Sequence, residues 1–267
     1  MSNPIRVIVA GANGRMGREV LATIRDTPDI KLVGAFDRNH VGEPVANLVP
    51  GLDGIVSGNL EELIQRLNPD VLVELTHHSC AADHARLAIS NKVATIIGTS
   101  GLSAEEIQSL REFCDVHRVP CGLIPNFSIG GVLMMHFAKI AAEWMPHAEV
   151  IELHHDGKLD APSGTATRTA ELIAESRKNS PQEAQGAVEK IPSARGAQHH
   201  QVRVHSVRLP GFVASQETLF GGKGQRLSIR HDSIDRASFM DGVLLSIRQI
   251  RGQKSFFVGL DKLMGLS

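Results

Sequence analysis

A chain of 267 residues, 42% of them hydrophobic, is long enough for one large domain or two smaller ones. Its net charge of −1 excludes the broad basic field of a nucleic-acid-binding protein, and no apolar run reaches the length of a membrane span. Three cysteines cannot all pair and lack zinc-site spacing, and no signal sequence precedes the first strand-like run. We therefore expect a cytoplasmic protein with free thiols, and no nucleic-acid, membrane or metal partner.

The first predicted elements are a strand at 5–10, a glycine turn at 11–17 and a helix at 18–26. A strand, a glycine turn and a helix in this order are typical of a dinucleotide-binding site. The turn reads Gly-Ala-Asn-Gly-Arg-Met-Gly, a G-x-x-G-x-x-G spacing rather than G-x-G-x-x-G, with Asn13 in place of a glycine.

Each glycine of the turn has an expected task. Gly11 permits the tight turn, Gly14 lets the backbone approach a pyrophosphate, and Gly17 allows close packing of helix and strand. After a second predicted strand at 31–36, Asp37 stands about 20 residues beyond Gly17, the interval of an acid that bonds a ribose hydroxyl. Arg38 beside it suits a 2′-phosphate, so both NADH and NADPH are expected as cofactors.

Strands and helices alternate through the rest of the first half, which predicts a Rossmann-type, doubly wound parallel sheet. The expected helices cover 59–67, 79–91 and 103–117, and the expected strands 70–75, 93–97 and 120–124. Ligands of such sheets lie at the carboxyl ends of the strands. We therefore expect Thr76, Gly98–Gly101 and Pro125–Phe127 to surround the same crevice as Gly11.

The pattern changes in the second half. An apolar helix at 129–144 precedes a strand at 149–154 and a helix that runs from Ser163 to 178, and a polar loop is expected at 179–200, with His199 and His200 exposed to solvent. Alternating strands at 201–208, 212–220 and 225–230 predict an open mixed sheet, followed by a helix at 236–251 and an apolar run at 256–260. The expected domains are a dinucleotide-binding domain at 1–126, an inserted α+β substrate and oligomerisation domain at 127–235, and a segment at 236–267 that returns to the first domain.

The stretch 152–166 gathers chemical groups at the junction of a predicted strand and helix. Ser163 is a plausible N-cap, and the backbone N–H groups of Gly164 and Thr165 would face an anion at the positive end of the helix. Lys158 adds a positive charge on the loop, and His154 and His155 point to opposite faces unless the strand has ended. A capped helix behind two surface histidines is the alternative interpretation.

Three other functions fit parts of the pattern. A metal-dependent hydrolase would use some of the thirteen histidines, but His154 and His155 lack the spacing of a zinc helix. A nucleotide-sensing protein would leave the Lys158 stretch without a role. A semialdehyde dehydrogenase would need Cys80, Cys114 or Cys121 as its nucleophile.

The motifs together resemble the 4-hydroxy-tetrahydrodipicolinate reductase (dihydrodipicolinate reductase) family nearly from end to end. The most specific one is Glu152-x-His-His-x-x-Lys-x-Asp-Ala-Pro-Ser-Gly-Thr-Ala166. Supporting matches are Gly11-Ala-x-Gly-Arg-Met-Gly17, Gly98-Thr-Ser-Gly101, Asn126-Phe-Ser-x-Gly130, His205-Ser-Val-Arg208 and Asp235-Arg-x-x-Phe239.

The resemblance implies a homotetramer that reduces a cyclic dicarboxylate in lysine and diaminopimelate synthesis, with hydride from NADH or NADPH. It implies that His154 and Lys158 are the proton donors. It assigns the substrate carboxylates to His155, Ser163, Gly164 and Thr165. It implies a cofactor site lined by Gly11, Ala12, Asn13, Gly14, Arg15, Met16, Asp37, Arg38, Gly98, Thr99, Ser100, Ile124, Pro125, Asn126 and Phe127.

The chain departs from the family's commonest pattern at three places. Glu74-Leu-Thr-His-His78 stands where Asp-Phe-Thr/Ser-x-Pro is more usual, Ser100 replaces a threonine, and Leu209-Pro-Gly211 replaces a glycine-rich run. The first two border the expected nicotinamide position, so they bear on cofactor preference. The acid–base motif is intact.

Overall fold

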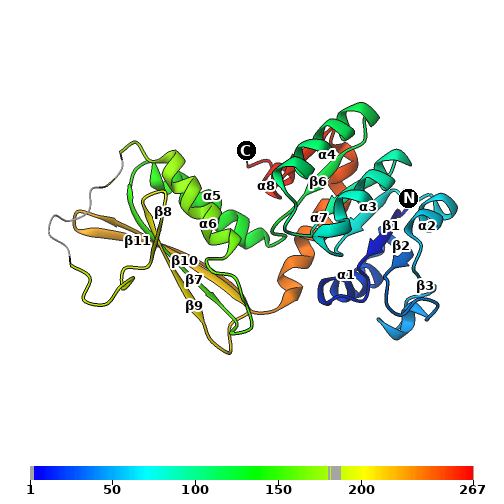
Figure 1. Cartoon of the computed structure of the whole chain (residues 1–267), viewed down its shortest axis with the longest axis horizontal. Helices are drawn as coiled ribbons and strands as arrows, with labels where there is room; N and C mark the ends of the chain where they lie inside the picture. Colours follow the sequence, from blue (N-terminus) through cyan, green and yellow to red (C-terminus); the bar gives the residue numbers. More distant parts are fainter. Residues whose placement is uncertain (1–2, 180, 182–187, 267) are drawn as a thin grey trace. The chain divides into compact units, whose positions relative to one another are not determined.

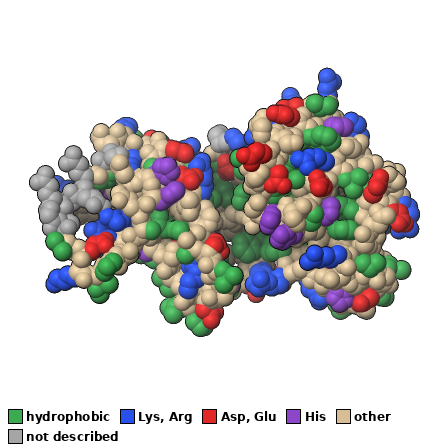
Figure 2. All heavy atoms as spheres, in the orientation of Figure 1, with side chains coloured by type: hydrophobic (Ala, Val, Ile, Leu, Met, Phe, Trp, Pro, Cys, Tyr) green, Lys and Arg blue, Asp and Glu red, His purple; other side chains and the backbone are tan. Residues whose placement is uncertain are grey.

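The computed structural model describes residues 3–179, 181 and 188–266, which form two compact units (Figure 1). The first unit comprises Met1–Phe127 and Phe239–Ser267, and the second comprises Ser128–Ser238. In the described part of the chain, no helix has both the length and the apolar character needed to cross a membrane. Acidic and basic side chains are interspersed on the face drawn in Figure 2, in keeping with the small net charge.

A sheet of seven parallel strands forms the centre of the first unit, in the order β12-β6-β5-β4-β1-β2-β3. The strands are β1 Ile5–Ala10, β2 Ile30–Phe36, β3 Val56–Ser57, β4 Val71–Glu74, β5 Ala94–Ile97, β6 Cys121–Leu123 and β12 Phe256–Val258. The chain winds outward from β1 in both directions, so the strand order reverses between β1 and β4. The predicted doubly wound parallel sheet is confirmed, and the C-terminal run supplies its edge strand β12.

Helices cover both faces of this sheet. They are α1 Arg15–Arg25, α2 Leu60–Leu67, α3 His78–Ser90, α4 Ala104–His117, α7 Met240–Gln249 and α8 Asp261–Met264, with a short 3-10 turn at Val45–Asn47. Ile8 and Ala10 pack into a cluster with α2 and α3, while Val7 and Val9 point the opposite way and are equally buried. This burial on both faces explains why the strand is a continuous apolar run.

Local capping fixes where these helices begin. The Asn59 side chain accepts a hydrogen bond from the Glu62 N–H at 3.1 Å, and Ser103 and Glu106 form the predicted capping box. Helix α1 begins at Arg15 rather than at 18, because the extended Gly14 is its N-cap. The helix predicted at 236–251 is shorter, since 3-10 turns at Arg236–Phe239 and Ile250–Gly252 flank α7.

A mixed sheet of five strands, in the order β11-β10-β7-β9-β8, forms the second unit. The strands are β7 His147–His154, β8 Ala197–His199, β9 Val202–Arg208, β10 Ala214–Gly222 and β11 Gln225–Ser233. Helices α5 Ile129–Ala142 and α6 Gly164–Ser176 lie over one face, where Val150, Val204 and Phe220 join their alanines in a buried core. The mixed sheet expected from the sequence is confirmed.

The expectation of a loop over the whole of 179–200 was wrong at its end. Residues 197–199 form β8, which pairs antiparallel with β9. His199 is half-buried rather than exposed, because its ring lies beside Glu171 of α6. The remainder of that prediction falls partly on 180 and 182–187, which lie outside the described residues.

Candidate functional site

The glycine turn of the first unit lies against the end of β4. Gly11 has φ +81°, and a Cβ placed there would lie 2.6 Å from the carbonyl oxygen of Leu75. A Cβ on Gly17 would lie 2.0 Å from the carbonyl oxygen of Gly11, so α1 packs on the turn too closely for any side chain. The turn therefore sits at the point where the strand order reverses, which is where such sheets bind ligands.

Asp37 holds the glycine turn in place. Its Oδ2 accepts a hydrogen bond from the Asn13 N–H at 2.9 Å, and its Oδ1 accepts one from the Asn39 N–H at 2.9 Å. The carboxylate is buried, whereas Arg38 and Arg15 are exposed, Met16 is half-buried and Ala12 is buried. The acid at the end of β2 and the turn after β1 thus form one structural unit.

The loops after β5 and β6 join the same edge of the sheet. A Cβ on Gly98 would lie 2.6 Å from Leu75 Cδ2 and 2.7 Å from Phe127 Cε2, so the ends of β4, β5 and β6 are in contact there. Ile124 and Phe127 are buried, Asn126 is half-buried, and Pro125 and Ser100 are exposed. Gly11, Gly98 and Phe127 therefore lie close together at this edge of the sheet, as the sequence predicts.

One buried hydroxyl at this edge fits a ligand. Thr99 Oγ1 is buried and makes no hydrogen bond to any described residue. A buried donor without a partner destabilises a protein by roughly 1–3 kcal/mol, so such groups normally meet a ligand or water. Thr99, the glycine turn and the open N-terminus of α1 fit a dinucleotide cofactor.

The unusual Glu74 is accommodated at the end of β4. Its carboxylate is fully buried and accepts hydrogen bonds from the N–H of Thr76, at 2.9 Å, and from the Thr76 hydroxyl. His84 Nδ1 lies 3.6 Å from the same carboxylate. Glu74, which is longer than the usual aspartate, thus fixes Thr76 through these hydrogen bonds. Thr76 is one of the residues expected at the crevice.

The three thiols are free, as predicted. Cys114 and Cys121 are fully buried in the core, and their mutual hydrogen bond, together with burial, raises the pKa of the Cys121 thiol well above its usual value. Cys80 is half-buried, and its sulfur lies 3.2 Å from Thr76 Oγ1. A thiol-dependent dehydrogenase would therefore have only Cys80 as an accessible candidate among the three.

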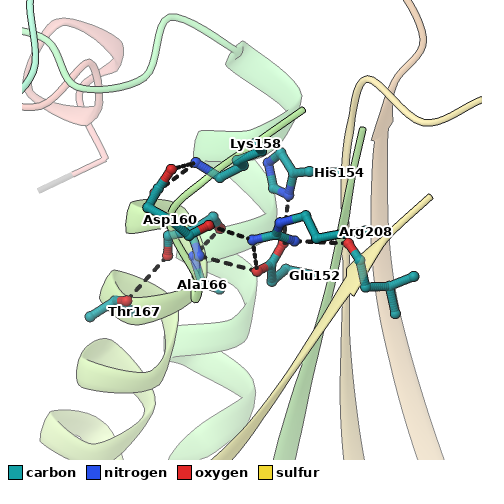
Figure 3. A network of polar contacts seen from close by, with 9 residues as sticks. Glu152, His154, Lys158, Asp160, Ala166, Thr167 and Arg208 are labelled. Atoms are coloured by element: carbon teal, nitrogen blue, oxygen red, sulfur yellow. Dashed lines mark hydrogen bonds and ion pairs between the residues drawn. The ribbon is translucent and has the colours of Figure 1, made fainter. Parts of the chain in front are cut away.

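In the second unit, a buried carboxylate organises the predicted acid–base motif (Figure 3). Glu152 of β7 is fully buried, and its Oε2 lies 2.5 Å from Nδ1 of His154. Arg208 of β9 donates one hydrogen bond to each oxygen of Glu152, both at 2.8 Å. The N–H of Ser163 donates to Glu152 Oε1 at 3.2 Å. A single carboxylate therefore joins strand β7, strand β9 and the start of α6.

This network keeps Glu152 ionised. Burial alone would raise its pKa, but hydrogen bonds from His154, Arg208 and Ser206 outweigh burial, so that the pKa of Glu152 falls to about 2. With its Nδ1 directed at this carboxylate, the imidazole of His154 has a fixed orientation, and its Nε2 is the nitrogen left for other contacts.

The remaining motif residues lie around the start of α6. Lys158 Nζ lies 2.7 Å from both carboxylate oxygens of Asp160, and Arg208 donates to the Asp160 backbone carbonyl at 2.8 Å. Strand β7 ends at His154, so His155 belongs to the following turn and is half-buried. His154, His155 and Lys158 of the motif therefore lie with Arg208 of β9 in one group, the loop cluster.

The start of α6 has the predicted cap. The Ser163 hydroxyl accepts a hydrogen bond from the Ala166 N–H at 3.2 Å, so both its hydroxyl and its N–H are used inside the protein. Gly164 is exposed, and a Cβ added there would meet nothing within 4 Å. Thr165 is half-buried in the same turn. The open first turn of α6 therefore suits an anion, with Ser163 holding its shape.

Sequence reasoning did not assign roles to three members of this cluster. Glu152, Asp160 and Arg208 occur in the quoted motifs, but the contacts of Arg208 with the other two depend on the pairing of β7 with β9, in which His154 lies opposite Arg208. One signal was available: Glu152 shares the alternation of the buried Val150, so the strand pattern places a carboxylate on the buried face. A buried carboxylate requires a cationic or hydrogen-bonding partner.

Glu152→Gln should destabilise the second unit in a pH-dependent way. Its pKa is lowered on folding, so the ionised group stabilises the protein above pH ~4.5, and this stability is lost as pH falls towards 2. The free energy of unfolding of the variant should be lower by about 3 kcal/mol at pH 6, and the difference should close towards pH 2. Urea unfolding followed by circular dichroism measures this.

Asp156→Asn is the control for that measurement, since it removes an exposed carboxylate from the same segment. It should leave the unfolding free energy within about 0.5 kcal/mol of the unmodified protein at every pH. A Glu152→Gln difference that stayed constant from pH 6 to 2 would contradict the assigned ionisation.

A parallel sheet with a glycine turn at its switch point, joined in one chain to a mixed sheet with a basic cluster, defines a two-domain, dinucleotide-dependent oxidoreductase. Two family models match the chain: "Dihydrodipicolinate reductase, N-terminus" over residues 5–127 and "Dihydrodipicolinate reductase, C-terminus" over 130–264. The chain belongs to the dihydrodipicolinate reductase family.

Individual relatives match the chain over nearly their whole length. The chain is 47% identical over 262 residues to the 4-hydroxy-tetrahydrodipicolinate reductase of Moorella thermoacetica, covering 97% of this chain and 98% of the relative. It is 46% identical over 266 residues to that of Syntrophomonas wolfei, covering 99% and 100%. A dipicolinate-bound dihydrodipicolinate reductase from Paenisporosarcina sp. TG-14 has a similar structure, with a TM-score of 0.86, 41% identity and coverage of 97% and 99%. An amine dehydrogenase from Mycobacterium smegmatis, 14% identical with a TM-score of 0.69 over 96% and 95%, shares the fold.

Proposed function

We propose that the protein reduces 4-hydroxy-tetrahydrodipicolinate to tetrahydrodipicolinate, a step of lysine and diaminopimelate synthesis. The observation that carries the proposal is identity of up to 47% along nearly the whole chain to relatives named for this reaction. The presence of dipicolinate, a cyclic dicarboxylate, in a relative of similar structure supports a cyclic dicarboxylate as substrate here.

Bound NADH or NADPH supplies the hydride. The reaction also takes up one proton, and the 4-hydroxyl of the substrate leaves as water. His154 and Lys158 are the proposed proton donors, because both lie in the loop cluster anchored by Glu152. The Glu152–Arg208 pair holds the imidazole of His154 so that Nε2 can face the substrate.

The substrate carboxylates are assigned to His155 and the first turn of α6. Gly164 lies open at the positive end of this helix, and Thr165 adds a hydroxyl beside it. Ser163 contributes by holding the turn, since its own polar groups bond to Glu152 and Ala166. A doubly negative substrate would be held by these donors together with Lys158.

A cytoplasmic homotetramer completes the proposal. Helices α5 and α6 cover one face of the five-stranded sheet, and Ile151 and Leu153 point to the other face, where they are half-buried. An incompletely covered sheet face suits association with further copies of the chain. Light scattering during size-exclusion chromatography measures the assembly state.

A coupled assay tests the reaction. The condensation product of aspartate semialdehyde and pyruvate is generated enzymatically, and the oxidation of NADH and of NADPH is followed separately by absorbance. Substrate-dependent oxidation of at least one cofactor is expected. Oxidation no faster than in a mixture without pyruvate, for both cofactors, would refute the proposed reaction.

Arg38→Ala should weaken the binding of NADPH more than that of NADH. Arg38 is exposed directly after Asp37, where a guanidinium can bond a 2′-phosphate that NADH lacks. A charged hydrogen bond contributes roughly 1.5–3 kcal/mol, so the Kd for NADPH should rise about tenfold or more while that for NADH changes less than about twofold. Fluorescence titration measures both constants.

Arg66→Ala, on the exposed surface of α2, is the matched control and should change neither constant. If Arg38→Ala raised the Kd for both cofactors equally, Arg38 would not be the residue that binds the 2′-phosphate.

A further inference from the structure

Three side chains with metal-binding atoms meet in a part of the second unit that the proposed reaction does not use. They are Glu171 of α6, His199 at the end of β8 and His200 in the turn before β9. One ligand atom from each lies within 4.8 Å of the others. Two imidazoles and a carboxylate are a donor set that zinc and neighbouring divalent metals bind.

The backbone brings the two adjacent histidines to the same place. His200 and Gln201 both have left-handed φ angles, of 47° and 61°, so the chain reverses tightly between β8 and β9. As a result the rings of His199 and His200 lie edge to face, with centroids 4.4 Å apart, instead of on opposite sides of a strand.

An arginine fixes this turn to the helix that carries Glu171. Arg177, at the end of α6, donates hydrogen bonds to the carbonyl oxygens of His200, at 2.8 Å, and Gln201, at 3.3 Å. The ligands are therefore held near one another by the fold itself, which lowers the entropy lost when an ion binds.

The separation of His199 from Glu171 suits two ligands of a tetrahedral ion better than an ion pair. His199 Nε2 and Glu171 Oε1 are 3.4 Å apart, which is long for a charged hydrogen bond. Two ligands at about 2.0–2.1 Å from a tetrahedral zinc ion are separated by about 3.3–3.4 Å. Glu171 Oε2 is held by Arg168 at 2.9 Å, and Oε1 is the oxygen beside His199. The hydrogen bond from Arg168 lowers the pKa of Glu171 and keeps the carboxylate charged.

We propose that Glu171, His199 and His200 bind a divalent transition-metal ion such as Zn²⁺, which clamps the β8–β9 turn to helix α6. Water completes the coordination. Two neighbouring guanidinium groups, of Arg168 and Arg177, oppose the positive charge, so the site has moderate affinity and adds stability rather than being required for folding.

Calorimetric titration of the full-length protein with Zn²⁺ alone tests the site. The unmodified protein should bind one more Zn²⁺ than His200→Ala, or bind it at least about tenfold more tightly, and Glu171→Gln should show the same loss. His147→Ala removes an exposed histidine elsewhere in the unit and should bind as the unmodified protein does. Saturating Zn²⁺ should also raise the Tm of the unmodified protein more than that of His200→Ala.

His200 is exposed, so its replacement leaves the core intact, and circular dichroism verifies folding of each variant. The proposal is overturned if the unmodified protein binds no Zn²⁺, or if His200→Ala and Glu171→Gln both bind it with unchanged stoichiometry and affinity. Reductase activity is independent of this outcome, which therefore leaves the proposed reaction untouched.

Discussion

Replacing His154 with glutamine should lower kcat by about 100-fold or more while leaving cofactor affinity unchanged. Loss of a general acid typically slows a reaction 10²- to 10⁴-fold. Glutamine fills similar space and can still bond to Glu152, but it cannot release a proton at neutral pH. Because Glu152 is held by Arg208 and the start of α6, the rest of the cluster should keep its geometry.

His147→Gln is the matched control, since it makes the same change at the exposed first residue of the same strand. It should retain turnover within about twofold. Steady-state kinetics with both variants, together with NADH and NADPH titrations, separate chemistry from binding. Full turnover by His154→Gln would exclude this histidine as the proton donor.

Lys158→Ala should lower kcat by a similar factor of about 100 or more. Its side chain is only 21% exposed, and its ammonium group lies in the cluster with His154. Removing it takes away both a potential proton and a charge that balances the substrate carboxylates. The KM for the substrate should therefore rise as kcat falls.

Asp160→Asn distinguishes the lysine itself from its ion pair. Asp160 is 68% exposed, and such surface pairs contribute little to stability, so this variant should fold normally and lose no more than a few-fold in turnover. If Asp160→Asn were as inactive as Lys158→Ala, the pair would be the functional unit. Full turnover by Lys158→Ala would show that the lysine is not a proton donor.

Periodicity and turn residues were sufficient to predict most of the fold. The buried run 5–10, the glycine turn and the caps at Asn59 and Ser103 are local signals, and each has a local cause in the structure. The short strand β8 was missed because its pairing with β9 supplies the stability that its sequence does not. The ends of α7 were misplaced because 3-10 turns have the same periodic pattern over a few residues.

The site was predictable as a list of residues but not as a set of contacts. His154, Lys158 and Ser163 lie in one contiguous motif. Arg208, which pairs with the Glu152 that holds His154 and Ser163, comes from a strand 56 residues further along the chain. Strand register decides which side chains meet, and register depends on the whole sheet. For the same reason, the sequence alone did not reveal that His199 lies beside Glu171, which is 28 residues away in the chain.

The double hydrogen bond of Asp37 has a consequence for engineering. Swapping the acid at the end of the second strand is an obvious route to altered preference between the two nicotinamide coenzymes. Here that acid also holds the glycine turn through Asn13, so we expect its replacement to loosen the turn and to weaken the binding of both coenzymes alike. Redesign of coenzyme selectivity should therefore begin at the neighbouring Arg38, whose side chain does not hold the glycine turn.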